Sequence, residues 1–257
     1  MTGTSAAAEA QHVHVLKILT PHVDVIAGGA SRQDPVSFIG ETWGSWLEGT
    51  DVAGTADAVL QELGGAVNRS QIAKFALNAV GAEGRMRLLL ATLMWGRGKS
   101  NGRMRHHIVK AVTYQSCDSV LEETQSLASD GDLAEAHRSW SLKWRMPGLG
   151  EPFFTKWFWA STLTLPSSEQ ALILDGRVWN TLGSLDWNSL DATAGDRHRA
   201  RRYEAYVEAA RRWAEDLTTP TRVVTPTDIE WGDVHGQRRP RAACLTGVRK
   251  LTPIQSQ

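Results

Sequence analysis

Arg145-Met-Pro-Gly-Leu-Gly-Glu-Pro-Phe153 is the most informative stretch of the chain, because a Pro-Gly-apolar-Gly turn here separates two helix-like segments. Glycine tolerates positive φ and close backbone approach, so Gly148 and Gly150 predict a tight hairpin between two helices. The second helix would begin with unpaired N–H groups, which can hold a phosphate. The residues leave open an ordinary helix–helix turn with Pro152 in the first helical turn.

A second motif, Ile173-Leu-Asp-Gly-Arg-Val178, follows the apolar pair Ala171-Leu172 and precedes a helix-like segment that starts at Trp179. Asp175 is well placed to cap that helix, because a carboxylate before the first helical turn accepts hydrogen bonds from backbone N–H groups. A carboxylate at the end of an apolar run is also partly desolvated. It can then stabilise a cation that develops in a nearby transition state.

Composition bounds the class of protein. The chain has 257 residues, of which 42% are hydrophobic and 22% charged, so it can bury a core as one large domain or two small ones. Cys117 and Cys244 lie far apart, which excludes a disulfide scaffold, a zinc ribbon and a four-cysteine iron–sulfur cluster. The histidines show no metal-ligand spacing, so we expect no catalytic metal.

The sequence lacks the patterns that direct a chain to a membrane or to secretion. No apolar run approaches the ~18 residues that a membrane helix needs. The segment 1–10 lacks the basic region and apolar core of a secretory signal. We therefore expect a cytoplasmic protein without a membrane partner.

The pattern of Ala, Leu and charged residues indicates a mainly α-helical chain with few strands. Residues 1–10 and 236–257 are polar enough to be loose. The expected helices cover approximately residues 37–48, 55–64, 69–80, 84–95, 102–115, 117–129, 153–163, 176–183, 197–217 and 226–232.

Charge is segregated although the total is zero. Residues 33–68 carry six acidic residues and no Lys or Arg, and residues 111–137 carry another six and again none. Basic residues collect in 97–110 and 197–202. Such segregation can create a positive face that neutralises phosphates, although each run is also compatible with a solvated helix face.

Together, the hairpin and the Asp175 motif resemble the helix-hairpin-helix DNA glycosylase superfamily, and the similarity runs from about Leu88 to Leu182. The segment Thr225-Pro-Thr-Asp-Ile-Glu-Trp231 is similar to the closing segment of the bacterial 8-oxoguanine-DNA-glycosylase-like branch. The resemblance implies a single all-α domain over residues 1–257 with a base pocket between two helical lobes. Its core would cover about 69–190, with 11–68 and 196–235 completing the second lobe.

This resemblance implies a monomeric enzyme that acts on duplex DNA without an organic cofactor. It would flip a modified base out of the duplex and cleave the N-glycosidic bond, which is out of reach while the base is stacked. Asp175 would stabilise the oxocarbenium-like sugar or orient the nucleophile. The backbone of Gly148, Leu149 and Gly150 would hold a phosphate beside the lesion.

Lys156 is the candidate for the lysine that forms a Schiff base with the sugar in bifunctional family members. That lysine normally lies two residues after the second hairpin glycine, where this chain has Pro152. Counted back from Asp175, however, the position of Lys156 matches the family spacing. The two counts agree only if about four residues are added after the hairpin, and Glu151–Phe154 are the candidates. A solvent-facing helix lysine is the alternative.

Further candidate residues follow from their position relative to the family motifs. The glycine-rich segment 96–102 lies where family members insert a loop into the duplex, so Lys99, Ser100 and Asn101 are the wedge candidates. Base-pocket and phosphate-binding residues are also expected among the nearby aromatic and basic side chains. The candidates are Trp144, Trp157 and Trp179 for the pocket, and Arg97, Arg103 and Arg105 for phosphates.

The substrate remains open between two classes. The branch implies an oxidised purine such as 8-oxoguanine, in DNA repair. Relatives also include enzymes thought to act on hypermodified phage DNA, for example glucosylated 5-hydroxymethylcytosine, in antiviral defence. The rival from another class is a non-catalytic DNA-binding module with Asp175 only as a cap. A glycosylase for mispaired adenine is a further rival, weakened by the absence of cluster cysteines.

Overall fold

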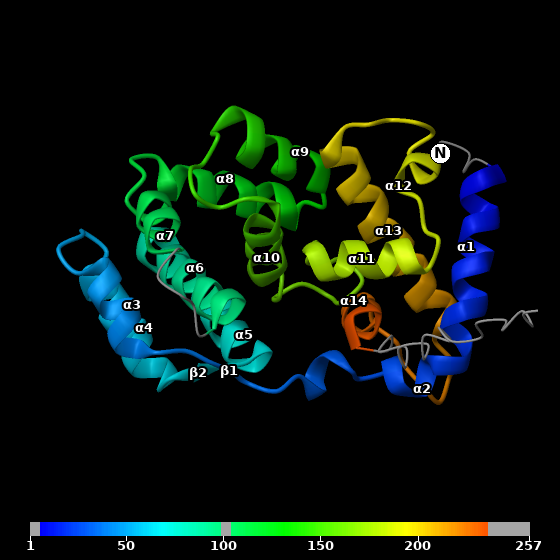
Figure 1. Cartoon of the computed structure of the whole chain (residues 1–257), viewed down its shortest axis with the longest axis horizontal. Coiled ribbons are helices and arrows are strands. Elements are labelled where there is room, and N and C mark those ends of the chain that lie inside the picture. Colours follow the sequence, from blue (N-terminus) through cyan, green and yellow to red (C-terminus); the bar gives the residue numbers. More distant parts are fainter. Residues whose placement is uncertain (1–5, 99–103, 236–257) are drawn as a thin grey trace, which may run out of the picture.

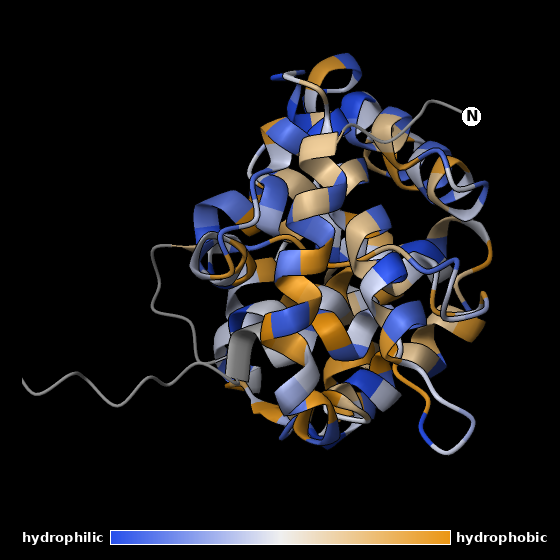
Figure 2. Cartoon of the chain, turned by 90° about the vertical axis from the view of Figure 1, so that its right-hand side faces the viewer, coloured by the Kyte–Doolittle hydropathy of each residue, from blue (hydrophilic) through white to orange (hydrophobic). Residues whose placement is uncertain are grey.

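The computed structural model describes residues 6–98 and 104–235, with side chains to residue 232. The described chain is all-α except for one short antiparallel pair of strands, which confirms the expected fold class (Figure 1). Most helices carry both polar and apolar residues, as is typical of helices with one buried face (Figure 2). Within the described ranges, none of the helices has the length and apolar character needed to cross a membrane.

The first lobe is built around α6, a buried helix with smaller helices packed on it. Two strands of two residues each pair antiparallel in this lobe, with Val36 opposite Val67. The described elements of this lobe are β1 (Val36–Ser37), α3 (Gly40–Leu47), α4 (Ala53–Leu63), β2 (Ala66–Val67), α5 (Arg69–Leu77), α6 (Gly81–Arg97), α7 (Arg105–Val112) and α8 (Cys117–Ser129).

The second lobe packs around α13, which contacts helices from both ends of the chain (Figure 1). Its described elements are α1 (Ala6–Leu19), η1 (Thr20–His22), α2 (Val23–Ile26), η2 (Ala30–Arg32), α9 (Leu133–Arg138), η4 (Ser139–Lys143), α11 (Gly176–Ser184), α12 (Ser189–Ala192), α13 (Arg199–Leu217) and α14 (Pro226–His235). Of these, α9 also contacts α8 and so links the two lobes.

Two expectations about the N-terminal part are wrong. Of residues 1–10, which the sequence predicts to be loose, 6–10 are helical, because His12, Val15 and Leu19 bury one face of α1 in the second lobe. Residues 1–5 lie outside the described residues. Residues 11–68 were expected to complete the second lobe as a unit. Only α1 to η2 do so, whereas α3 and α4 pack with α6 in the first lobe.

Helix α10 (Glu151–Ser161) lies between the lobes and is buried on all sides from Phe154 onward. It packs against α5, α6 and α8. Lys156 is the only charged residue of this helix after its first turn. A charged side chain is therefore held in the apolar centre of the molecule, where it needs a partner.

The segment 171–174 is buried and leads toward α11 without pairing in a strand. A buried backbone needs hydrogen-bond partners, and here side chains supply them. The N–H groups of Ala171 and Leu174 donate to the hydroxyls of Thr162 and Thr155, at 2.9 and 3.0 Å. On the carbonyl side, the hydroxyls of Tyr203 and Tyr206 on α13 donate to Leu172 and Ile173, at 2.7 and 3.3 Å.

We predict that Thr155→Val lowers the free energy of unfolding by about 1–3 kcal/mol, because the buried N–H of Leu174 loses its acceptor while the side-chain shape is kept. Urea denaturation followed by circular dichroism measures this. Thr113→Val is the matched control, since its exposed hydroxyl only donates to the helix carbonyl of Val109. Equal stability of the two variants would contradict the role of Thr155.

Candidate active site

Asp175 lies directly before α11 and uses its two carboxylate oxygens differently. Oδ1 accepts hydrogen bonds from the backbone N–H groups of Arg177 and Val178, at 2.9 and 3.3 Å, so Asp175 is the N-cap of α11. Oδ2 accepts a hydrogen bond from Nζ of Lys156 at 3.1 Å. The cap holds the carboxylate in one orientation while its second oxygen faces the lysine.

Lys156 comes from the middle of α10 and is nearly buried, with 10% of its side chain exposed. Its ammonium also donates to the carbonyl oxygen of Pro152 at 3.1 Å. The alternative of a solvent-facing lysine is therefore wrong, because α10 has no free face at this position. Gly96 on α6 allows the close approach, since a Cβ there would lie 3.1 Å from Cδ of Lys156.

Burial lowers the pKa of Lys156 below the usual lysine value, although the neighbouring Asp175 carboxylate acts in the opposite direction. Burial also acts to raise the pKa of Asp175. The Lys156 ammonium and the two backbone N–H groups outweigh it, so this carboxyl pKa lies below its usual value. Asp175 is thus ionised at neutral pH, and Lys156 loses its proton more easily than a surface lysine.

Glu151–Phe154, the candidates for added residues after the hairpin, are helical. Helix α10 begins at Glu151, directly after Gly150, so these four residues form its first turn. Pro152 lies in this turn, as in the alternative of an ordinary helix–helix turn, and Lys156 lies beyond it. The contact between Lys156 and Asp175 agrees with the count made backward from Asp175.

Lys156 and Asp175 line a cavity of about 280 Å³ whose walls come from both lobes. Arg69 is one of the lining residues, and its guanidinium donates hydrogen bonds to Glu230 at 2.7 Å and to Gln33 at 2.9 Å. The same guanidinium lies 5.3 Å from the ring centre of Trp95. Nη1 of Arg69 is buried without a hydrogen-bond partner among the described residues. The cavity thus has hydrogen-bond donors, an acceptor and an aromatic face close to the lysine.

Sequence reasoning missed these cavity residues, although weak signals existed. Glu230 lies within the Thr225–Trp231 segment singled out above, and Trp95 ends the apolar face of α6. Arg69 and Gln33 carry no motif, because they reach the cavity only through the packing of α5 and the segment before β1. The remaining lining residues are Val36, Gly96, Arg97, Gly98, Ile173, Arg177, Val178 and Trp231.

Trp144, Trp157 and Trp179, which the sequence predicts to line the base pocket, do not line this cavity. Trp157 is fully buried and donates to Thr124 on α8, on the other side of α10. Trp144 donates to Glu123. Trp179 packs under the guanidinium of Arg202.

The hairpin loop joins η4 to α10. Gly148 has a φ of 81°, and a Cβ at this residue would overlap the carbonyl oxygen of His107 on α7, so only glycine fits. Gly150 has a negative φ of −78°, and a Cβ there would make only an ordinary contact with Cδ of Pro152, at 4.0 Å. Within the described residues, the backbone N–H groups of Gly148, Leu149 and Gly150 donate to no backbone carbonyl.

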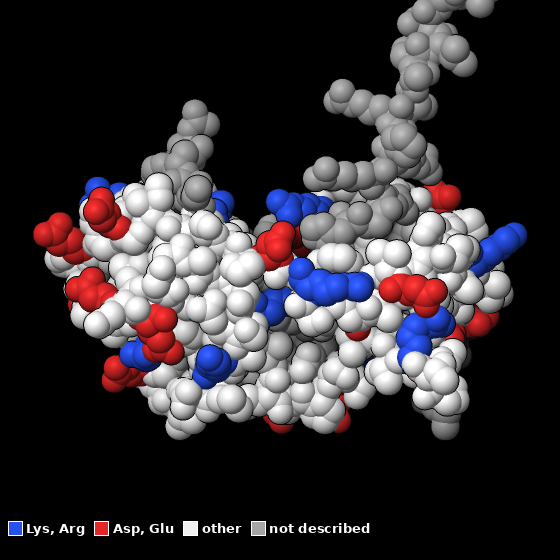
Figure 3. Space-filling view, turned by 90° about the horizontal axis from the view of Figure 1, so that it is seen from below, with Lys and Arg blue, Asp and Glu red and all other residues white. Residues whose placement is uncertain are grey.

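The basic candidates are placed differently. Arg97 lines the cavity with its guanidinium 4.0 Å from the ring centre of Phe153, and burial lowers its pKa. Arg105 is exposed at the start of α7. Arg103 and the wedge candidates Lys99, Ser100 and Asn101 lie outside the described residues. Figure 3 shows basic and acidic side chains beside the hollow between the lobes.

Family comparison agrees with this geometry. The model of the family described as "Putative 8-oxoguanine DNA glycosylase OGG-like protein" matches residues 29–232. This covers most of the chain, so the chain belongs to that glycosylase family, and the resemblance stated above is confirmed. No curated protein and no solved structure matches the chain. Among the described residues, no cluster of three or more His, Cys, Asp or Glu is arranged to hold a metal ion.

We predict that Asp175→Ala unfolds about 1 kcal/mol more easily than Asp175→Asn, because the amide oxygen of Asn still caps α11 and alanine cannot. Both variants remove the negative charge beside Lys156, so that effect cancels in the comparison. Thermal and urea denaturation measure the difference. Equal stabilities would show that Oδ1 contributes nothing to the helix start.

We predict that Gly148→Ala lowers the free energy of unfolding by about 1–3 kcal/mol, because the methyl group meets the His107 backbone at positive φ. Gly150→Ala is the matched control and should change stability by less than about 0.5 kcal/mol. Urea denaturation of the two variants compares them. Similar losses at both glycines would contradict the hairpin geometry.

Proposed function

We propose that the protein is a DNA N-glycosylase that takes a modified base into the cavity between its lobes and cleaves the N-glycosidic bond, leaving an abasic site. The observation that carries the proposal is the buried 3.1 Å contact between Lys156 and Asp175 at this cavity. A flipped base enters such a cavity from outside the duplex, while its sugar stays at the mouth.

In this proposal, Asp175 acts on the sugar. As the bond between C1′ and the base breaks, the base leaves with the electron pair and positive charge develops on the sugar. An ionised carboxylate fixed by two backbone N–H groups needs no reorientation to stabilise that charge. Water then supplies a hydroxyl group to C1′ and a proton to the base.

Lys156 offers a second route from the same position. Its neutral amine can attack C1′, displace the base with the bonding electron pair, and lose its proton to give a Schiff base with the opened sugar. Elimination of the 3′ phosphate from that intermediate would then cut the strand. The lowered pKa and burial of Lys156 support this role, because both favour the neutral amine.

The remaining residues would position the DNA. The hairpin N–H groups of 148–150 would hold a phosphate, and exposed Arg105 would contact another. The wedge role of residues 99–101 remains a prediction from their place in the chain.

We favour an oxidised purine of the 8-oxoguanine type as the substrate. Such a base carries carbonyl oxygens and N–H groups on several edges. The cavity offers complementary groups: the guanidinium of Arg69, the carboxylate of Glu230 and the ring of Trp95. The family description supports the same class. A hypermodified phage base is the second candidate, and it would make the role antiviral defence rather than repair.

Mass spectrometry of small molecules released from DNA tests the proposal. The panel holds oxidised, alkylated and deaminated duplexes together with glucosylated phage DNA. We expect free 8-oxoguanine from the oxidised duplex and no release from undamaged DNA. Release of a glucosylated cytosine would instead identify the hypermodified phage base as the substrate, and the enzyme class would stay the same. Tight DNA binding without release of any base would favour a binding module.

We predict that borohydride traps the wild-type protein covalently on substrate DNA and does not trap Lys156→Gln. Because burial lowers the pKa of Lys156, the trapping rate should rise with pH and level off below the usual lysine pKa of about 10.4. Lys74→Gln, at an exposed position of α5, is the control and should be trapped like the wild type. Base release by the wild type without any trapping would restrict the enzyme to hydrolysis.

A further inference from the structure

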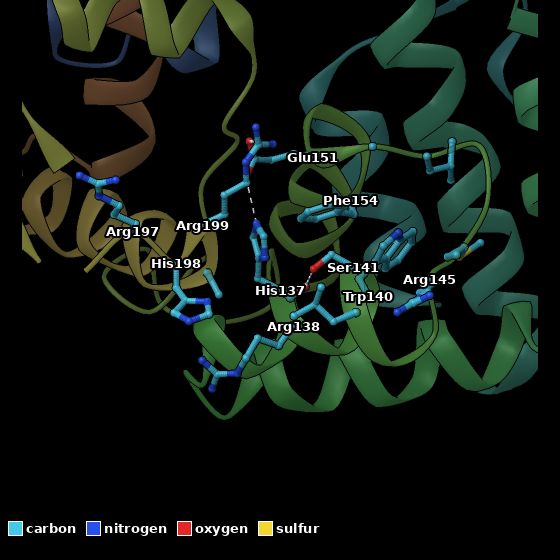
Figure 4. A pocket seen from close by; sticks show the side chains of 15 residues that line it. His137, Arg138, Trp140, Ser141, Arg145, Glu151, Phe154, Arg197, His198 and Arg199 are labelled. Atoms are coloured by element: carbon cyan, nitrogen blue, oxygen red, sulfur yellow. Dashed lines mark hydrogen bonds and ion pairs between the residues drawn. The ribbon is translucent and has the colours of Figure 1, made fainter. Parts of the chain in front are cut away.

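We call the cavity lined by Lys156 and Asp175 the reaction cavity. A second pocket lies on the opposite side of α10. It has a volume of about 610 Å³ and is formed by α9, η4, the hairpin loop, the start of α10 and residues 197–200 (Figure 4). Its lining residues include Phe154, whereas Lys156 two positions later lines the reaction cavity. Residues two apart on a helix point about 200° apart, and the two pockets share no residue.

The rim of this second pocket, which we call the arginine pocket, is basic. Arg138, Arg145, Arg197, His198 and Arg199 line it, against one carboxylate, Glu151. That carboxylate is already held by Nε2 of His137 at 2.9 Å, and Arg199 lies 3.9 Å from its other oxygen. Arg138 pairs with Glu135. Within the described part of the chain, Arg145 and Arg197 have no ion pair, so the pocket has an excess of positive charge that attracts an anion.

The wall of the pocket is apolar. Trp140, Met146, Leu149 and Phe154 form it, and Leu142 adds a side chain that is 59% exposed. The indole N–H of Trp140 is buried and has no hydrogen-bond partner among the described residues. Inorganic phosphate would use only the arginines, and a purely apolar ligand only the wall.

Arg145 is held in an unusual backbone conformation, with a φ of 47°. A positive φ is uncommon outside glycine and is maintained only where the surroundings require it. Figure 4 shows Arg199 beside the His137–Glu151 pair, and in that view Phe154 and Trp140 lie between this group and Arg145. Arg145 and Arg199 therefore line different parts of the pocket.

We propose that the arginine pocket binds a nucleotide, with its phosphate at the basic rim beside Arg145, which has no ion pair within the described residues, and its planar base against the apolar wall and the flat guanidinium groups. Arginine suits both contacts, since it binds phosphate in a bidentate manner and stacks on planar rings. The nucleotide is either free or an unpaired nucleotide of DNA. Leu149 and Gly150 belong to both the pocket and the hairpin loop, so DNA held at the hairpin passes near its mouth.

Isothermal titration calorimetry on the full chain tests this site. The probes are dGMP, deoxyguanosine, inorganic phosphate and a short single-stranded oligonucleotide. We expect dGMP to bind at least tenfold more tightly than deoxyguanosine or phosphate alone, because only dGMP uses both halves of the pocket. Tighter binding of the oligonucleotide than of dGMP would identify DNA as the source, and the reverse would identify a free nucleotide.

Variants locate the binding. Arg145→Ala should weaken dGMP binding about tenfold through the loss of a charge-assisted contact, and Leu142→Glu should weaken it at least as much by repulsion at an exposed position. Arg201→Ala is the charge-matched control, because Arg201 lies on α13 outside the pocket and pairs with Glu204. Lys156→Gln should leave dGMP binding unchanged.

Four outcomes would overturn the proposal. They are no binding of dGMP by the wild type, unchanged binding by Arg145→Ala and Leu142→Glu, equal loss in Arg201→Ala, and loss in Lys156→Gln. The last would place the nucleotide in the reaction cavity instead. Base release is measured separately, so failure of this site and failure of the glycosylase proposal are distinguishable.

Discussion

The buried backbone of residues 171–174 is the constraint on which the proposed reaction centre depends. It has no strand partner, so hydroxyls from α10 and α13 and the carboxylate of Glu230 satisfy its polar groups. These contacts fix the point at which the chain delivers Asp175 to the start of α11. Because Thr155 lies one residue before Lys156, the same helix that anchors this segment also presents the lysine. The 3.1 Å contact between Lys156 and Asp175 follows from that arrangement.

The first turn of α10 lies between the hairpin and Lys156. Glu151–Phe154 are four helical residues, which span about 6 Å along the helix axis. Glu151 in this turn is held by His137 and faces the arginine pocket, while Lys156 faces the reaction cavity. One helix therefore contributes residues to both pockets.

Local patterns predicted the all-α fold, the glycine at position 148 of the hairpin and the cap at Asp175, because these depend on residues close together in sequence. The backward count from Asp175 placed Lys156 correctly. What the sequence could not provide depends on packing between distant segments: the location of α3 and α4 in the first lobe, and the meeting of Arg69 with Glu230. The prediction for the tryptophans failed for the same reason. The sequence pattern around Trp157 is the same whether its ring packs against α8, as it does, or lines a pocket.

The central claim is that Asp175 acts in bond cleavage and not only as a helix cap. Single-turnover base release by wild type and Asp175→Asn, at DNA concentrations where both proteins are saturated, tests it most directly. The account predicts that Asp175→Asn binds DNA with similar affinity and stays folded, but releases base at least 100-fold more slowly, which corresponds to about 2.7 kcal/mol of transition-state stabilisation. Release at the wild-type rate would contradict the account and leave Asp175 a structural residue.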